Sequence, residues 1–225
     1  MASNLLLYGD NLDILRKRIP TESVDLVYLD PPFNSNRSYN VLFGDHKKEP
    51  DQAQIEAFDD TWIWTPDTDR IFFDLLNGGV PNRVADALRA YHQLMGEGDV
   101  LAYLVMMAPR LVELHRVLKT TGSLYLHCDP TASHYLKLLM DAVFDPRHFR
   151  NEVIWKRTAA KGDARRKYGS IHDVVLVYGK SGLAYFEPAR RPPDDEYRAR
   201  FKYDDHDGRG PFQSAPLDAR IPGRT

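Results

Sequence analysis

Short apolar runs alternate with segments of helical spacing over the first 180 residues. The run at residues 24–29 is apolar enough to predict a strand that is buried on both faces. Residues 4–9 form a shorter apolar run. Between these two runs, residues 11–19 carry leucine and isoleucine at helical spacing. The pattern therefore predicts a β-α-β unit with two parallel strands.

The later pattern adds further helices and strands. Residues 34–69 are polar apart from FDDTWIW and predict a long loop with little regular structure, a kind of loop that is often functional. Residues 82–118 predict two helices separated by GEGD. The rest predicts, in order, a strand at 123–129, a helix at 131–144 capped by threonine or serine, and strands at 152–157 and 173–180. This order indicates an α/β fold with a mainly parallel sheet.

Composition narrows the class of protein. The chain has 225 residues, 43% of them hydrophobic and 28% charged, which supports a folded core. The amino terminus has no basic start, no apolar run is long enough for a membrane span, and the single Cys128 excludes an internal disulfide and a cysteine-based zinc site. We therefore expect a soluble, cytoplasmic protein without a membrane partner.

Charge is distributed unevenly along the chain. The net charge is −2, but residues 156–225 hold fifteen Lys or Arg and ten Asp or Glu. The densest basic run contains six cations and one acid, and its cations are Lys156, Arg157, Lys161, Arg165, Arg166 and Lys167. Such a run is either a solvated loop or a mobile arm that contacts phosphate, and charge alone leaves both open.

Two acids follow the first two predicted strands. Asp30 ends the run at residues 24–29 and is followed by two prolines, which cannot continue the ladder of a strand. Asp10 likewise stands directly after an apolar run, the one at residues 4–9. Ligands of open α/β sheets bind beyond the carboxyl ends of the strands, so both carboxylates are candidates for a ligand that donates hydrogen bonds. The alternative for Asp10, with Asn11 beside it, is to cap the first helix.

These motifs together resemble the amino-methyltransferases of DNA. DPPF at residues 30–33 is accompanied, in order, by LLLYGDNLDIL, SVDLVYLDPPFNSNRSYN, LKTTGSLYLHCDPTASHYLKLLMDAVF, RNEVIWKR and HDVVLVYGKS. This order is similar to the N-4/N-6 methyltransferases that carry the catalytic motif near the amino terminus, including modification subunits of type III restriction systems. The resemblance spans roughly residues 4–210 and implies a class I S-adenosylmethionine-dependent methyltransferase fold.

The resemblance implies catalytic roles for the four residues of DPPF. The carboxylate of Asp30 and the main-chain carbonyl of Pro31 would accept hydrogen bonds from the exocyclic amino group of a flipped base. Pro31 and Pro32 fix the backbone, and Phe33 offers a stacking face worth ~1–3 kcal/mol per base. The acid favours adenine as the target, and the amino group of cytosine is the alternative.

The resemblance also implies a cofactor and partners. Asp10, Asn11 and Asp30 would contact S-adenosylmethionine, and the basic run would hold double-stranded DNA. A restriction subunit or a missing carboxyl-terminal half is a further candidate partner. A non-catalytic DNA-binding fragment of such an enzyme is the competing interpretation.

One family motif is absent from the sequence. No segment matches the aromatic–x–Gly–x–Gly cofactor loop, and the GxG of DGRGPF at residues 207–212 follows no apolar strand. We therefore expect an incomplete sheet. Residues 1–187 are interpreted as the catalytic-motif part of a DNA methylase domain, and residues 188–225 as a linker or the start of a truncated target-recognition region.

Two further features remain ambiguous in the sequence. His127, Cys128 and Asp129 contain potential metal ligands, but neighbouring side chains of a strand point to opposite faces, so we expect strand-end residues and no metal site. Trp62 and Trp64 either line a nucleotide cleft or pack the long loop.

Overall fold

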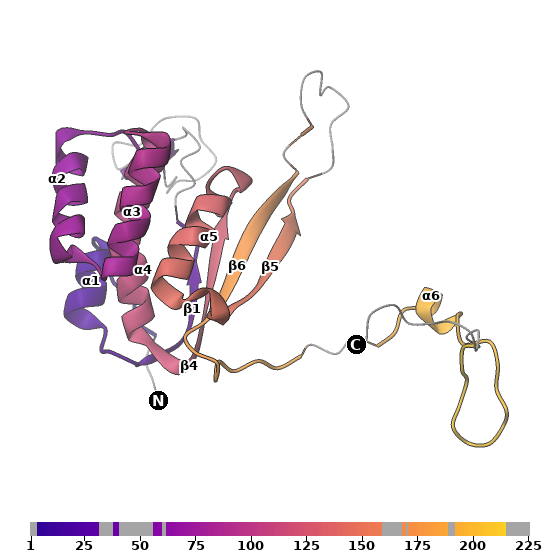
Figure 1. Ribbon diagram of the computed structural model, residues 1–225. Helices are drawn as coiled ribbons and strands as arrows, with labels where there is room; N and C mark the ends of the chain where they lie inside the picture. The colour runs from indigo at the N-terminus through magenta and orange to yellow at the C-terminus, as the bar shows by residue number, and fades with distance from the viewer. Residues whose placement is uncertain are drawn as a thin grey trace, which may run out of the picture. The chain divides into compact units, whose positions relative to one another are not determined.

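The computed structural model describes residues 4–31, 38–40, 56–59, 62–158, 168–169, 171–188 and 192–214. The chain divides into two compact units, Met1–Tyr185 and Phe186–Thr225. The first unit is an α/β structure in which helices pack on a sheet (Figure 1). No helix of the described part is long and apolar enough to cross a membrane.

A four-stranded mixed sheet forms the centre of the first unit. Its strands lie in the order β1 (Val24–Leu29), β4 (Leu118–Cys128), β6 (His172–Gly179) and β5 (Phe149–Lys156). Only β1 and β4 pair in parallel, whereas β4–β6 and β5–β6 are antiparallel. The prediction of a mainly parallel sheet was therefore wrong. Consecutive strands β5 and β6 have no predicted helix between them, and a parallel pair needs such a crossover.

The predicted strand at residues 4–9 is not formed. These residues have no strand pairing in the structure, and the side chains of Leu5, Leu6 and Tyr8 are exposed. Strand β1 has one strand neighbour, β4, in the described sheet, and Leu26 and Tyr28 are 58% and 59% exposed. The prediction that β1 is buried on both faces was therefore wrong. An apolar run becomes a buried strand only where neighbours cover both its edge and its faces.

Helices supply most of the core. The helical elements of the first unit are α1 (Asn11–Arg18), α2 (Pro66–Asp74), the π-helical turn η1 (Leu75–Gly79), α3 (Asn82–Met95), α4 (Asp99–Val117), α5 (Pro130–Phe144) and the 3-10 turn η2 (Pro146–His148). The predicted break between two helices at GEGD is confirmed. Fully buried leucines from α4, α5 and β4 join in one cluster, and each contributes about 1.5–3 kcal/mol through burial: Leu104, Leu111, Leu136, Leu124 and Leu126.

The segment predicted as a long loop contains regular structure. Strands β2 (Ser38–Asn40) and β3 (Glu56–Asp59) pair with each other, and α2 already begins at Pro66. The side chain of Thr65 caps that helix by accepting from the backbone N–H of Thr68. The loop prediction was wrong for these parts, and the rest of the segment lies outside the described residues.

Helix α5 has a strong cap at its start. Asp129 accepts hydrogen bonds from the backbone N–H groups of Thr131 and Ala132, at 3.0 and 3.1 Å. Aspartate is among the residues that cap helices best, and Pro130 occupies the first helical position. The expected threonine or serine cap was therefore wrong, because Thr131 and Ser133 lie two and four residues after the observed cap.

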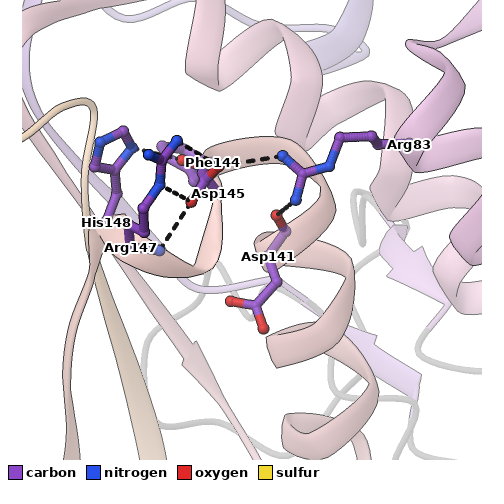
Figure 2. Close-up of polar contacts among 6 residues, drawn as sticks. All are labelled: Arg83, Asp141, Phe144, Asp145, Arg147 and His148. Atoms are coloured by element: carbon purple, nitrogen blue, oxygen red, sulfur yellow. Dashed lines mark hydrogen bonds and ion pairs between the residues drawn. The ribbon is translucent and has the colours of Figure 1, made fainter.

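The end of α5 is stabilised by polar contacts that Figure 2 shows. Asp145 has a positive φ of 75°, and its carboxylate accepts hydrogen bonds from the backbone and side chain of Arg147. Arg83 of α3 reaches the same carboxylate at 3.3 Å and the main-chain carbonyl of Asp141 at 3.3 Å. The guanidinium of Arg147 lowers the pKa of Asp145. These contacts fix the chain reversal between α5 and β5.

The second unit contains little regular structure in its described residues. Helix α6 (Asp195–Arg198) has four residues, and an isolated bridge joins Tyr203 to Phe212. Asp194 caps α6 by accepting from the backbone N–H of Tyr197. The weak periodicity after residue 188 predicted this lack of long helices and strands.

Candidate active site

A cavity of about 620 Å³ lies beyond the carboxyl end of β1. Several sequence-predicted site residues meet at its wall, although they come from separate segments. Its lining consists of Leu7, Tyr8, Gly9, Asp10, Asn11, Leu29, Asp30, Pro31, Trp62, Met106, Met107 and Arg110. The wall thus combines apolar surface from α4 with carboxylate and amide oxygens.

Asp30 stands directly after β1, and its side chain is 59% exposed. Its Oδ1 lies 3.0 Å from Nδ1 of His127, which is on the neighbouring strand β4. Pro31 is buried beside it. Pro32 and Phe33 lie outside the described residues, so their roles in backbone rigidity and base stacking stay predictions.

Asp10 and Asn11 are held in place from two sides. Asp10 is the cap of α1, and its Oδ1 accepts from the backbone N–H of Leu12 at 2.7 Å. Nη2 of Arg110 donates to both oxygens of Asp10, at 3.1 and 3.0 Å, and Nε donates to Oδ1 of Asn11 at 2.7 Å. The capping alternative for Asp10 is therefore confirmed. Asp10 and Asn11 still line the cavity, so a cofactor contact stays a prediction.

Arg110 is a site residue that sequence reasoning missed. It lies on α4, donates to the main-chain carbonyl of Met106 at 2.8 Å, and its side chain is only 18% exposed. Burial lowers the pKa of Arg110, and the carboxylate of Asp10 offsets part of that effect. The signal was available, because Arg110 is the one charged residue in the apolar run at residues 101–111 and a buried cation requires a partner.

The two tryptophans have different environments. Trp62 lines the cavity and packs against Tyr103, with the ring centroids 6.2 Å apart. Trp64 packs edge-on against Phe72 at 5.6 Å and lies near His92. Of the two alternatives left open by the sequence, cavity lining therefore fits Trp62 and loop packing fits Trp64.

His127 and Cys128 lie on opposite faces of β4, as predicted. Cys128 is buried in the core cluster, and burial raises the pKa of its thiol to about 12. His127 lies between Asp30 and Asp173, because its Nε2 is 3.4 Å from Oδ2 of Asp173. Within the described residues, no group of three or more His, Cys, Asp or Glu side chains could hold a metal ion.

The described part of the basic run contains Lys156 and Arg157. Lys156 ends β5 and is exposed. Nη1 of Arg157 lies 3.0 Å from Oδ1 of Asp173, so part of its charge serves an internal ion pair. The other predicted DNA contacts, Lys161, Arg165, Arg166 and Lys167, lie outside the described residues and stay predictions.

Comparison with known proteins gives a family match over most of the chain. Residues 24–214 match the family described as DNA methylase (N6_N4_Mtase). The Mod subunit of the type III restriction-modification enzyme StyLTI from Salmonella typhimurium is 28% identical over 214 residues, which cover 88% of this chain and 29% of that protein. The DNA adenine methyltransferase YhdJ of Escherichia coli K12 is 26% identical, covering 80% of this chain and 42% of the relative.

The chain thus spans less than half the length of these two relatives. Among solved structures, a DNA modification methylase of Thermus thermophilus complexed with S-adenosyl-L-methionine is similar at 16% identity. That similarity covers 88% of this chain and 62% of the other, with a TM-score of 0.40.

Proposed function

The chain belongs to the N6/N4 DNA methylase family, and from this we propose that it forms the catalytic edge of a DNA adenine methyltransferase. The proposed reaction transfers a methyl group from S-adenosylmethionine to the exocyclic amino group of adenine. The observation that carries the proposal is that Asp30 and Pro31 line one cavity together with Asp10 and Asn11.

Asp30 and Pro31 have the chemistry that an amino group requires. The lone pair of an exocyclic amine is delocalised into the ring, so the amine is a poor nucleophile. A carboxylate oxygen and a main-chain carbonyl that accept its two hydrogens orient the nitrogen and stabilise the positive charge that develops there. The site needs no covalent intermediate with the protein.

The cavity is suited to hold an adenosine-containing cofactor. S-adenosylmethionine would supply an electrophilic methyl group. Met106, Met107 and Leu29 provide apolar surface for a purine ring, and Asp10 and Asn11 provide oxygens that accept from ribose hydroxyls. A cavity of about 620 Å³ lies within the usual size range of small-molecule sites.

Adenine is the preferred target base in this proposal. The acid of DPPF at Asp30 favours adenine, and the relative YhdJ is described as a DNA adenine methyltransferase. Methylation of the amino group of cytosine is the second candidate, because the matching family includes both N6 and N4 enzymes.

A restriction-modification setting is supported by the StyLTI relative, which is described as a Mod subunit. In that setting, a restriction subunit is a proposed partner, and double-stranded DNA with a flipped base is the proposed substrate. Because the chain covers 29% of that relative, we propose that further residues complete the enzyme at the edge of β1 that no strand of the described sheet covers. The basic run at residues 156–167 is the proposed DNA-contacting segment.

Methyl transfer to DNA tests the proposal directly. The complete enzyme that contains this chain is incubated with tritiated S-adenosylmethionine and unmethylated DNA. Asp30→Ala should lower the transfer rate by at least about 100-fold, since it removes the main acceptor for the amino group. Asp13→Ala is the matched control, because Asp13 is an exposed aspartate that pairs only with Lys17 in the described structure. Equal rates for the Asp30 variant and the wild type would contradict the catalytic assignment.

A further inference from the structure

Four charged or ionisable side chains form a continuous row across the sheet. Asp30 follows β1, His127 lies on β4, Asp173 lies on β6, and Arg157 follows β5. The three contacts along the row are 3.0 Å from Asp30 to His127, 3.4 Å from His127 to Asp173, and 3.0 Å from Asp173 to Arg157. The row begins at the proposed catalytic carboxylate and ends at the start of the basic run.

The register of the sheet explains why these side chains meet. Leu29 pairs with Leu126, so the next residues of the parallel pair, Asp30 and His127, are neighbours on one face. His127 pairs with Val175, and Asp173 lies two residues before Val175 on the same face. Asp173 is therefore a diagonal neighbour of His127, at a spacing that long side chains bridge.

The middle of the row is much less exposed than its catalytic end. The side chain of Asp173 is only 5% exposed, and that of His127 is 19% exposed. A buried carboxylate is costly unless a charged partner stabilises it, and Arg157 is that partner here. Nε2 of His127 lies 3.4 Å from the other carboxylate oxygen of Asp173. Asp30 differs, because its side chain is 59% exposed. An exposed carboxylate with no fixed neighbour would rotate freely, whereas catalysis requires one orientation.

We propose that His127 is a positioning residue for Asp30, and that the Asp173–Arg157 ion pair fixes the imidazole ring. In this arrangement, which rests on the proposed function, Nδ1–H of His127 donates to Oδ1 of Asp30 and leaves Oδ2 to accept from the target amino group. Oδ1 is the oxygen of Asp30 that lies against the imidazole ring. Asp173 faces the other nitrogen, and it sets the ring orientation in the doubly protonated ring, in which Nε2–H also points at a carboxylate oxygen.

The first test uses NMR of the 225-residue chain and does not depend on activity. The chain has eight histidines, and the ring nitrogen signals that His127→Asn removes are those of His127. Asp30→Asn should shift mainly the Nδ1 signal, and Asp173→Asn should shift mainly the Nε2 signal. If neither substitution moves the His127 signals, the contacts do not exist in solution and the inference is overturned.

The second test compares two substitutions of His127 in the complete enzyme. The amide nitrogen of Asn lies near the position of imidazole Nδ1, whereas that of Gln lies near Nε2. His127→Gln should lower kcat by about 10- to 100-fold with a smaller change in KM, because Asp30 loses its donor. His127→Asn should restore most of that loss. Asp173→Asn should also lower kcat, as His127→Gln does.

The outcomes separate positioning from a merely structural role. Equal losses in the Asn and Gln variants, or lowered thermal stability that accounts for both, would show a structural role and overturn the inference. Unchanged turnover in His127→Gln would also overturn it, even with coupled NMR signals. A wild-type enzyme that transfers no methyl group to DNA would contradict the proposed function, while the NMR experiment would still decide whether the row exists.

Discussion

The two faces of the sheet have different roles. On the face that packs against the helices, Leu124 and Leu126 of β4 are completely buried and belong to the core cluster. On the opposite face of the same strand, His127 contacts Asp30 and Asp173, while Leu26 of β1 is 58% exposed. Alternation along one strand therefore assigns stability to one face and the proposed chemistry to the other. Asp30 stands where that second face meets the cavity.

The largest expected effect on stability comes from shortening a leucine to alanine in the helix-covered core, compared with the same change on the exposed face of the sheet. Leu136→Ala on α5 should lower the free energy of unfolding by about 2–5 kcal/mol, because it leaves a cavity in the helix-covered core. Leu26→Ala is the matched control on the exposed face and should change it by no more than about 0.5 kcal/mol in the 225-residue chain.

Chemical unfolding of both variants measures this difference. A cost for Leu26→Ala as large as that for Leu136→Ala would mean that both faces are equally buried in solution. The same pair in the complete protein sharpens the comparison. There, a larger cost for Leu26→Ala would support the proposal that further residues cover β1.

Arg110→Ala tests the contacts that hold the cavity wall. Removing the guanidinium leaves Asp10 and Asn11 without their shared donor, which should cost about 1–3 kcal/mol of unfolding free energy. Arg18→Ala is the control, because Arg18 is exposed at the end of α1, the helix that Asp10 caps and Asn11 begins. Thermal unfolding that shows equal effects for the two arginines would refute the role of Arg110.

Substitutions at the start of α5, directly after β4, should have a smaller effect on the free energy of unfolding. Asp129→Ala should lower the free energy of unfolding by about 1 kcal/mol, because two backbone donors lose their acceptor. Thr131→Ala, at the position that the sequence pattern favoured as a cap, should change it by only a few tenths of a kcal/mol. A larger effect for Thr131 than for Asp129 would contradict the observed cap.

Acid should destabilise the helix-covered side through His115 of α4. Burial lowers the pKa of His115 to about 4, and nearby Lys180 adds to the effect. Between the ordinary pKa of about 6.5 and pH 4, the unfolded chain therefore binds more protons than the folded one, so stability falls as the pH falls. His115→Gln should flatten the dependence over this interval. The exposed His134→Gln should leave it unchanged, and identical pH profiles for the two variants would exclude the role of His115.

The sequence predicted helices α1, α3, α4 and α5 and most strands, but it missed α2 and the pairing of the strands. The spacing of leucines in α4 and α5 indicates a helix without reference to other segments, and the break at GEGD was visible in the sequence. The direction of β6 relative to β4 depends on contacts between distant segments, which a local pattern does not contain. Residues 4–9, which pair with no described strand, show the same limit, because their apolarity predicts burial but does not indicate which segment would cover them.

The sequence named some of the residues that line the cavity, but not the contacts between them. Asp30 and Asp10 were recognised because each follows a predicted strand, at the sheet edge where ligands of α/β folds bind, and both line the cavity. Arg110 and Asp173 were missed, because the role of each depends on a contact with a residue that is distant in the sequence. The row from Asp30 to Arg157 arises from the register of four strands.

The most direct test of the proposed function identifies the methylated base. DNA treated with the complete enzyme and S-adenosylmethionine is digested to nucleosides and analysed by mass spectrometry. The account predicts N6-methyladenine with the wild type and its near-complete loss with Asp30→Ala. Formation of N4-methylcytosine in its place would contradict the adenine assignment, and undiminished N6-methyladenine with Asp30→Ala would contradict the proposed catalytic role of Asp30.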